Sequence, residues 1–181
     1  MRIVVSGSHA TGKSTLVSDL ALACPSYVVL PDPWELVDEE DAASPSSFVA
    51  QLHVAAERLG EWGPGADAIA ERGPLDLLAY LVAWGGLGRG GISANRLADL
   101  MEVCAAAMAH VDVLVVLPVD ERAGIHVPDD EDPELREAMD TALLDLLEDA
   151  SLVGEAEVLE LTGSPEQRLD RLAERLRRDG P

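Results

Sequence analysis

Close to its N-terminus the chain reads Gly7-Ser8-His9-Ala10-Thr11-Gly12-Lys13-Ser14. The segment fits G-x-x-x-x-G-K-[ST] in full, a glycine-rich turn whose backbone N–H groups and lysine cradle phosphates. Residues 2–6 before it form a short apolar run typical of a buried strand, and residues 13–23 continue as a helix. A helix N-terminus that follows such a turn favours an anion. The sequence therefore predicts that these eight residues, with Thr15, bind a nucleoside triphosphate.

The choice of basic residues supports this prediction. Thirteen residues are lysine or arginine, and Lys13 is the only lysine among them. A compact ammonium fits between the β- and γ-phosphates of a nucleotide, where a planar guanidinium does not. We therefore expect Lys13 to contact the phosphates during catalysis.

Length and charge limit the possible roles. A chain of 181 residues suits one domain, and we expect residues 1–181 to form it. The formal charge of −21, with no basic cluster outside the C-terminal helix, makes nucleic acid a poor partner.

Cysteine usage and hydropathy bear on the compartment. Cys24 and Cys104 lack metal-ligand spacing and are expected to be reduced thiols. No apolar run approaches the roughly 18 residues of a membrane span, and the first residues do not resemble a secretion signal. We expect a cytoplasmic protein without a membrane partner.

Alternating strand and helix patterns predict an α/β fold. Strands are expected near residues 2–6, 26–31, 66–71, 111–117 and 155–161, and helices near 13–23, 46–61, 75–85, 93–109, 133–148 and 165–178. This pattern predicts a parallel α/β sheet, and the phosphate-binding loop points to a three-layer P-loop NTPase fold, for which we expect a five-stranded parallel sheet in the order 2-3-1-4-5 and helices on both faces. The helices near 75–85 and 93–109 fit either the core or the face of a homodimer.

In such sheets ligands bind at the carboxyl ends of the strands. After the second strand the chain reads Pro31-Asp32-Pro33-Trp34-Glu35. Asp32 is a candidate general base for an attacking hydroxyl, and Glu35 is the alternative. Asp-Pro pairs also start turns, and the sequence leaves both interpretations open.

A glutamine on the second helix is a candidate ligand for the acceptor. Gln51 lies beside an apolar stripe, where its amide can donate and accept hydrogen bonds at a heterocycle edge. A boundary glutamine on an amphipathic helix is the simpler interpretation of this position.

The third strand runs into Glu71-Arg72-Gly73-Pro74. Glu71, together with Ser14, is predicted to hold Mg²⁺, and Arg72 to stabilise charge on a transferring phosphoryl group. A surface ion pair is the alternative, but a Gly-Pro turn directly after the pair favours a functional role.

Residues 118–132 form a long polar segment after the fourth strand, and such a segment can close over phosphates as a lid. Arg122 in this segment, and Arg136 on the helix after it, are the permanent cations available to neutralise the phosphates. His126 offers a third contact that depends on pH.

These motifs resemble two related groups of enzymes. Residues 7–14 resemble the phosphate loop of the nicotinamide riboside kinase-like AAA group of P-loop proteins. The order Asp32-Pro33-x-Glu35, Phe48-x-x-Gln51, Glu71-Arg72 and an arginine-bearing lid is similar to the deoxynucleoside kinases. The resemblance implies that Asp32 is the general base, that Gln51 recognises a nucleobase, and that Glu71 and Arg72 serve Mg²⁺ and phosphate.

Two features depart from that family. Gly73-Pro74 replaces the usual small hydroxyl residue after the arginine, and Phe48 is the only phenylalanine. An aromatic sandwich around a base would therefore draw on other rings, for which the candidates are Trp34, Trp62, Trp84, Tyr27 and Tyr80.

We expect an ATP- and Mg²⁺-dependent kinase that phosphorylates a hydroxyl of a small nucleoside-like metabolite. A sugar or antibiotic acceptor, or an ATP-binding regulator with little turnover, are the alternatives. A GTPase switch is excluded, because it needs a guanine-reading Asn-Lys-x-Asp segment, and the chain has Pro118-Val119-Asp120-Glu121 after the fourth strand.

Overall fold

The central strand sorts its side chains to two faces. In the computed structural model, which describes residues 1–37, 43–120, 127 and 131–179, strand β1 spans Arg2–Ser6. Ile3 and Val5 pack into one hydrophobic cluster and Val4 into another, as the two-residue period of a strand requires. Both faces of β1 are buried, which explains the uninterrupted apolar run of Ile3, Val4 and Val5.

Five parallel strands form the sheet in the order β2-β3-β1-β4-β5. β3 (Ala68–Glu71) and β4 (Val113–Val116) flank β1, while β2 (Val28–Leu30) and β5 (Glu157–Glu160) lie at the edges. The predicted fold class and strand order are confirmed. Since all strands run the same way, Ser6, Leu30, Glu71 and Val116 end at the same edge of the sheet.

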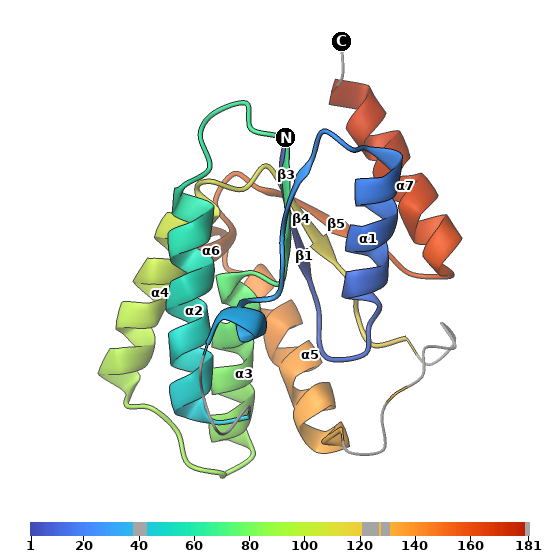
Figure 1. Ribbon diagram of the computed structural model, residues 1–181. Helices are drawn as coiled ribbons and strands as arrows, with labels where there is room; N and C mark the ends of the chain where they lie inside the picture. The colour runs from blue at the N-terminus through green and yellow to red at the C-terminus, as the bar shows by residue number, and fades with distance from the viewer. Residues whose placement is uncertain (38–42, 121–126, 128–130, 180–181) are drawn as a thin grey trace.

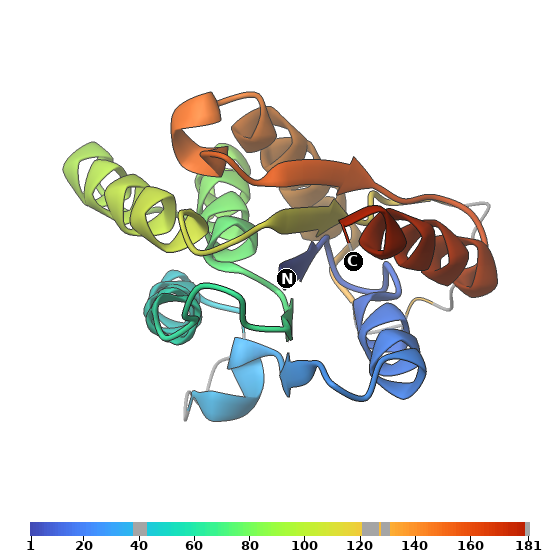
Figure 2. The same ribbon diagram turned by 90° about the horizontal axis from the view of Figure 1, so that it is seen from above.

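Helices cover both faces of the sheet (Figures 1 and 2). One face carries α1 (Lys13–Ala23) and α7 (Pro165–Asp179), which lie side by side. The other face carries the remaining helices, which are α2 (Pro45–Gly60), α3 (Pro74–Gly86), α4 (Ala94–Met108), α5 (Pro133–Leu147) and α6 (Ala150–Val153). None of the helices in the described part of the chain is long and apolar enough to cross a bilayer.

α3 belongs to the core of the single chain. Leu75, Leu77, Leu78 and Tyr80 are all buried, and the helix packs between α2 and α5. Its apolar sequence is therefore explained without a second copy of the chain.

Two short elements were not predicted. Pro33–Leu36 form a 3₁₀ helix (η1) and Ala150–Val153 form α6, and each is capped by an aspartate that accepts a backbone N–H. Each has only four residues, which is too short for a periodic pattern. η1 is the element that fixes the position of Asp32.

Candidate functional site

The loop between β1 and α1 turns tightly against β4. Gly7 has φ 149° and Gly12 has φ 91°, which are values that glycine adopts readily. A Cβ at Gly7 would lie 2.5 Å from the carbonyl oxygen of Leu117. The first glycine is therefore required both by the backbone conformation and by the space.

A buried aspartate holds the start of this loop. Asp76 on α3 accepts hydrogen bonds from Ser6 Oγ (2.6 Å), Gly7 N (2.8 Å) and Gly73 N (2.9 Å). The carboxylate thus ties the end of β1 to the turn between β3 and α3. Sequence reasoning missed this role, although an acidic residue in the first turn of a helix that starts with Gly-Pro was the available signal.

The ammonium of Lys13 is hydrogen-bonded to the backbone of its own loop. Lys13 Nζ donates to the carbonyl oxygen of Ser8 at 2.7 Å, and the side chain is buried. Burial and the nearby charge of Arg72 lower the pKa of Lys13 to about 8. A cation in this state gains stability from any anion that enters beside it.

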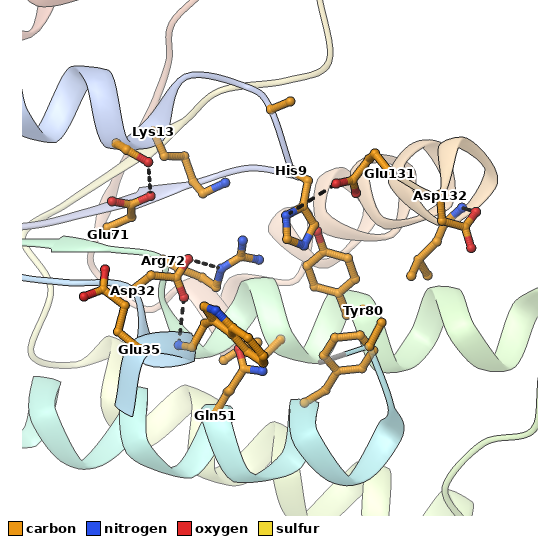
Figure 3. A pocket seen from close by; sticks show the side chains of 17 residues that line it. His9, Lys13, Asp32, Glu35, Gln51, Glu71, Arg72, Tyr80, Glu131 and Asp132 are labelled. Carbon is orange, nitrogen blue, oxygen red and sulfur yellow. Dashed lines mark hydrogen bonds and ion pairs between the residues drawn. The ribbon is translucent and has the colours of Figure 1, made fainter. Parts of the chain in front are cut away.

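Ser14 and Glu71 meet at the edge of the sheet. Ser14 Oγ donates to Glu71 Oε1 at 2.5 Å, which joins the first turn of α1 to the end of β3 (Figure 3). A hydroxyl and a carboxylate are the oxygen ligands that Mg²⁺ takes in nucleotide sites. The pair fits the predicted metal position.

Asp32 and Arg72 form a buried ion pair. Arg72 Nε donates to Asp32 Oδ2 at 3.0 Å, and Arg72 is only 5% exposed. Its φ of 68° is unusual for a residue with a Cβ. Arg72 also lies over the ring of Tyr80, with 5.3 Å between the guanidinium carbon and the ring centroid.

The two carboxylate oxygens of Asp32 have different partners, and the turn predicted at Asp32-Pro33 is present. Asp32 Oδ1 accepts from Trp34 N and so starts η1, while Oδ2 pairs with Arg72. Burial raises the pKa of Asp32, but the Arg72 charge and the Trp34 N–H outweigh it, and the net pKa lies below the usual value. The carboxylate is therefore ionised at neutral pH.

These groups line one cavity of about 630 Å³. Lys13, Arg72 and His9 converge in its middle, with Glu71 and Asp32 on one side and Gln51 below (Figure 3). Of the predicted acceptor ligands, Gln51 lies on the wall and donates from Nε2 to Ser47 Oγ at 2.9 Å. Trp34 is 43% exposed, and Glu35 lines the same cavity.

Two aromatic rings form part of the cavity wall. The ring of Tyr80 stacks on Phe48 with 4.9 Å between centroids, and both line the cavity. Tyr80 comes from α3 and Phe48 from α2, so a single wall depends on two helices. The sequence suggested aromatic contributors but gave no way to choose Tyr80.

Arg136 supports the phosphate loop from α5. Its Nε donates to the carbonyl oxygen of His9 at 2.9 Å, and its own carbonyl accepts from Ser8 Oγ at 3.0 Å. It is not among the residues that line the cavity.

Burial and the charges of Arg72 and Lys13 lower the pKa of His9, so its imidazole is neutral at physiological pH.

Part of the predicted lid falls outside the described residues. Arg122 and His126 belong to residues 121–126, which the structure does not describe, and the same holds for residues 128–130.

Comparison with known protein families shows the family of this chain. A sequence model of the AAA domain family matches residues 2–168. The chain belongs to the AAA domain family. Comparison with curated protein sequences gives no match.

Solved structures share the fold of this AAA domain protein. Deoxyadenosine kinase from M. mycoides with bound dATP superposes with a TM-score of 0.73 at 13% identity, over 98% of this chain and 100% of the other. The same enzyme with dCMP and dCDP bound gives the same values. Thymidylate kinase from Candida albicans has a TM-score of 0.65 at 16% identity, over 98% of this chain and 91% of the other. The AAA domain family and the P-loop fold expected from the sequence are therefore confirmed.

Proposed function

We propose that the protein is a kinase that moves the γ-phosphoryl group of ATP to a hydroxyl of a small nucleoside-like metabolite. The observation that carries this proposal is the buried pair of Asp32 and Arg72, which shares one cavity with Lys13 and Glu71. A carboxylate base, an arginine and a phosphate loop in one cavity are the parts that phosphoryl transfer needs.

On the donor side, Lys13 and the N–H groups of residues 7–15 bind the phosphates. Ser14 and Glu71 would hold Mg²⁺, which would offset the negative charge of the phosphates. Arg72 stabilises charge on the transferred group. We assign the same role to Arg122, which lies outside the described residues. Arg136 acts on the nucleotide through the loop carbonyl of His9.

On the acceptor side, Asp32 accepts the proton of the attacking hydroxyl. Arg72 holds this carboxylate in one orientation through the 3.0 Å bond, and positioning of this kind supplies much of the rate in phosphoryl transfer. Trp34, Phe48 and Tyr80 provide flat apolar surfaces, and Gln51 reads the edge of the base. The cavity volume lies in the range of small-molecule sites.

The shared fold of deoxyadenosine kinase and thymidylate kinase also favours a nucleoside-like acceptor. We assign the reaction to a single domain of residues 1–181 working in the cytoplasm, with no nucleic-acid or membrane partner and with a homodimer as one possible assembly.

The test is an acceptor screen. The protein is incubated with ATP, Mg²⁺ and panels of nucleosides, nucleotides and sugars, ADP release is followed, and products are identified by mass. We expect nucleosides to stimulate ADP release and Lys13→Ala to abolish it. A phosphorylated sugar in place of a nucleoside would refute the acceptor class, and ATP binding without turnover on any acceptor would refute the kinase.

A further inference from the structure

Four carbonyl groups of the phosphate loop accept hydrogen bonds from basic side chains. Ser8 O accepts from Lys13 Nζ, and Arg136 donates to His9 O and Ala10 O. The fourth carbonyl, that of Thr11, accepts from Arg168 Nη1 at 2.5 Å. In a trans peptide the N–H points opposite to the C=O. A carbonyl turned toward Arg168 therefore turns the N–H of Gly12 the other way, toward the position of a bound phosphate.

Arg168 is unlike the other arginines of α7. It lies in the first turn of the helix, where α7 runs beside α1 (Figures 1 and 2), and it is 2% exposed. Within the described part of the chain, its Nε and Nη2 atoms are buried and have no hydrogen-bond partner. Burial lowers the pKa of Arg168, and the charge of Asp120 opposes this shift.

Such an arrangement is unfavourable for folding alone. A buried guanidinium with one hydrogen bond and unpaired N–H groups destabilises the folded state, and an apolar side chain of similar volume is often as good or better. The presence of Arg168 is therefore better explained by a function that uses a positive charge behind the phosphate loop.

We propose that Arg168 is a positioning residue for the triphosphate, which orients the Gly12 peptide through Thr11 O and places a buried positive charge behind the phosphate loop. This inference rests on the proposed nucleotide site. A bound triphosphate supplies the opposite charge, and the buried setting weakens solvent screening between the two. The benefit grows with the number of phosphates.

The experiment compares three substitutions on α7. Arg168→Met removes the bond and the charge, and Arg168→Gln keeps a donor without the charge. The matched control is Arg171→Met, since Arg171 also donates to a backbone carbonyl, Glu160 O at 3.2 Å, but is exposed and contacts the end of β5. Dissociation constants for ATP, ADP and adenosine are measured by calorimetry, and stability is measured by urea unfolding.

We expect Arg168→Met to weaken ATP binding by roughly ten- to a hundredfold, the range for losing a hydrogen bond to a charged group. In Arg168→Met, the affinity for ADP should fall less than that for ATP, and the affinity for adenosine should hardly change. The ATP affinity of Arg168→Gln should lie between those of wild type and Arg168→Met. The ATP affinity of Arg171→Met should match wild type. KM for ATP should rise while KM for the acceptor stays the same.

Equal affinity loss for all three ligands, in step with a loss of stability, would reduce Arg168 to a structural role and overturn the inference. So would wild-type ATP affinity in a folded Met variant, or in the Gln variant if Met prevents folding. Failure of the wild-type protein to bind ATP would instead refute the proposed function.

Discussion

Arg72 Nε lies 3.0 Å from Asp32 Oδ2, and this contact joins the ends of two neighbouring strands, β3 and β2. Arg72 is buried, Asp32 is partly buried, and the ring of Tyr80 lies against the guanidinium. It fixes the orientation of the carboxylate and holds it ionised. The contact thus joins the proposed base and the proposed phosphate-binding cation into one unit.

Asp32→Asn should lower kcat by about 10²- to 10⁴-fold, the usual contribution of a general base. ATP affinity should stay near the wild-type value, because the phosphate loop is untouched. Glu35→Gln is the matched control, since Glu35 lines the same cavity but has greater exposure, and its kcat should barely change. The opposite ranking of the two variants in steady-state assays would make Glu35 the base.

ATP binding should be coupled to proton uptake by Lys13. Burial lowers the pKa of free Lys13 to about 8, and a bound anion raises it again. At pH 8 roughly half of the free protein lacks this proton, so binding takes it up, whereas near pH 6.5 little uptake remains. ATP affinity should fall as pH rises above 8 for the same reason.

Calorimetry in two buffers with different ionisation heats measures the number of protons taken up. Identical heats in both buffers at pH 8 would show that Lys13 is already charged in the free protein.

Gln51→Leu should raise KM for a nucleoside acceptor by about tenfold, since one polar contact to the base edge is lost. KM for ATP should not change. Ser47→Ala is the control, because it removes only the acceptor of the Gln51 amide. Equal acceptor KM values in wild type and Gln51→Leu would mean that no base edge is read at this position.

Asp76→Asn should lower the free energy of unfolding by about 2–4 kcal/mol, since an amide cannot accept all three hydrogen bonds that the buried carboxylate accepts. Asp67→Asn removes a half-exposed partner of the N-terminal amino group and should cost about 0–1 kcal/mol. Urea unfolding gives both values, and similar losses would contradict the role of Asp76 as the anchor of the loop.

Gly73→Ala should be destabilising by about 1–3 kcal/mol through overpacking. The added Cβ would lie 2.7 Å from Cγ1 of Val4, which is fully buried. In a Val4→Ala background the same substitution should cost less, because the clashing methyl is gone. Additive losses in this double-mutant cycle would mean that the clash is not the cause.

This clash also explains a departure from the expected motif. Where a small hydroxyl residue was expected after Arg72, the space beside Val4 admits only glycine. Gly73 then caps α3, and Pro74 fills the first helical position. No local pattern contains this information, because the neighbour lies on another strand.

The exact ends of the strands are also not contained in the local sequence pattern. The first strand has the predicted bounds, but the other four are shorter than predicted, since strand length depends on which residues find a parallel partner. Likewise, sequence reasoning assigned Arg136 to the nucleotide, whereas the structure directs its guanidinium to a loop carbonyl. Whether that role also serves binding stays a prediction.

By itself the sequence determined the parallel α/β class and the loop at residues 7–14, because local periodicity and glycine spacing encode them. The strand order was expected from the P-loop fold and not from any local pattern. It also singled out Asp32, Glu71 and Arg72 as site candidates, since polar residues directly after parallel strands lie at one edge of the sheet, and Gln51 from its place beside an apolar stripe of a helix. Only the tertiary structure decided which groups pair. The bond of Asp32 with Arg72, the anchoring by Asp76 and the buried charge of Arg168 join residues from 40 to 157 positions apart. Such contacts arise from packing between elements, for which no single segment carries a signal.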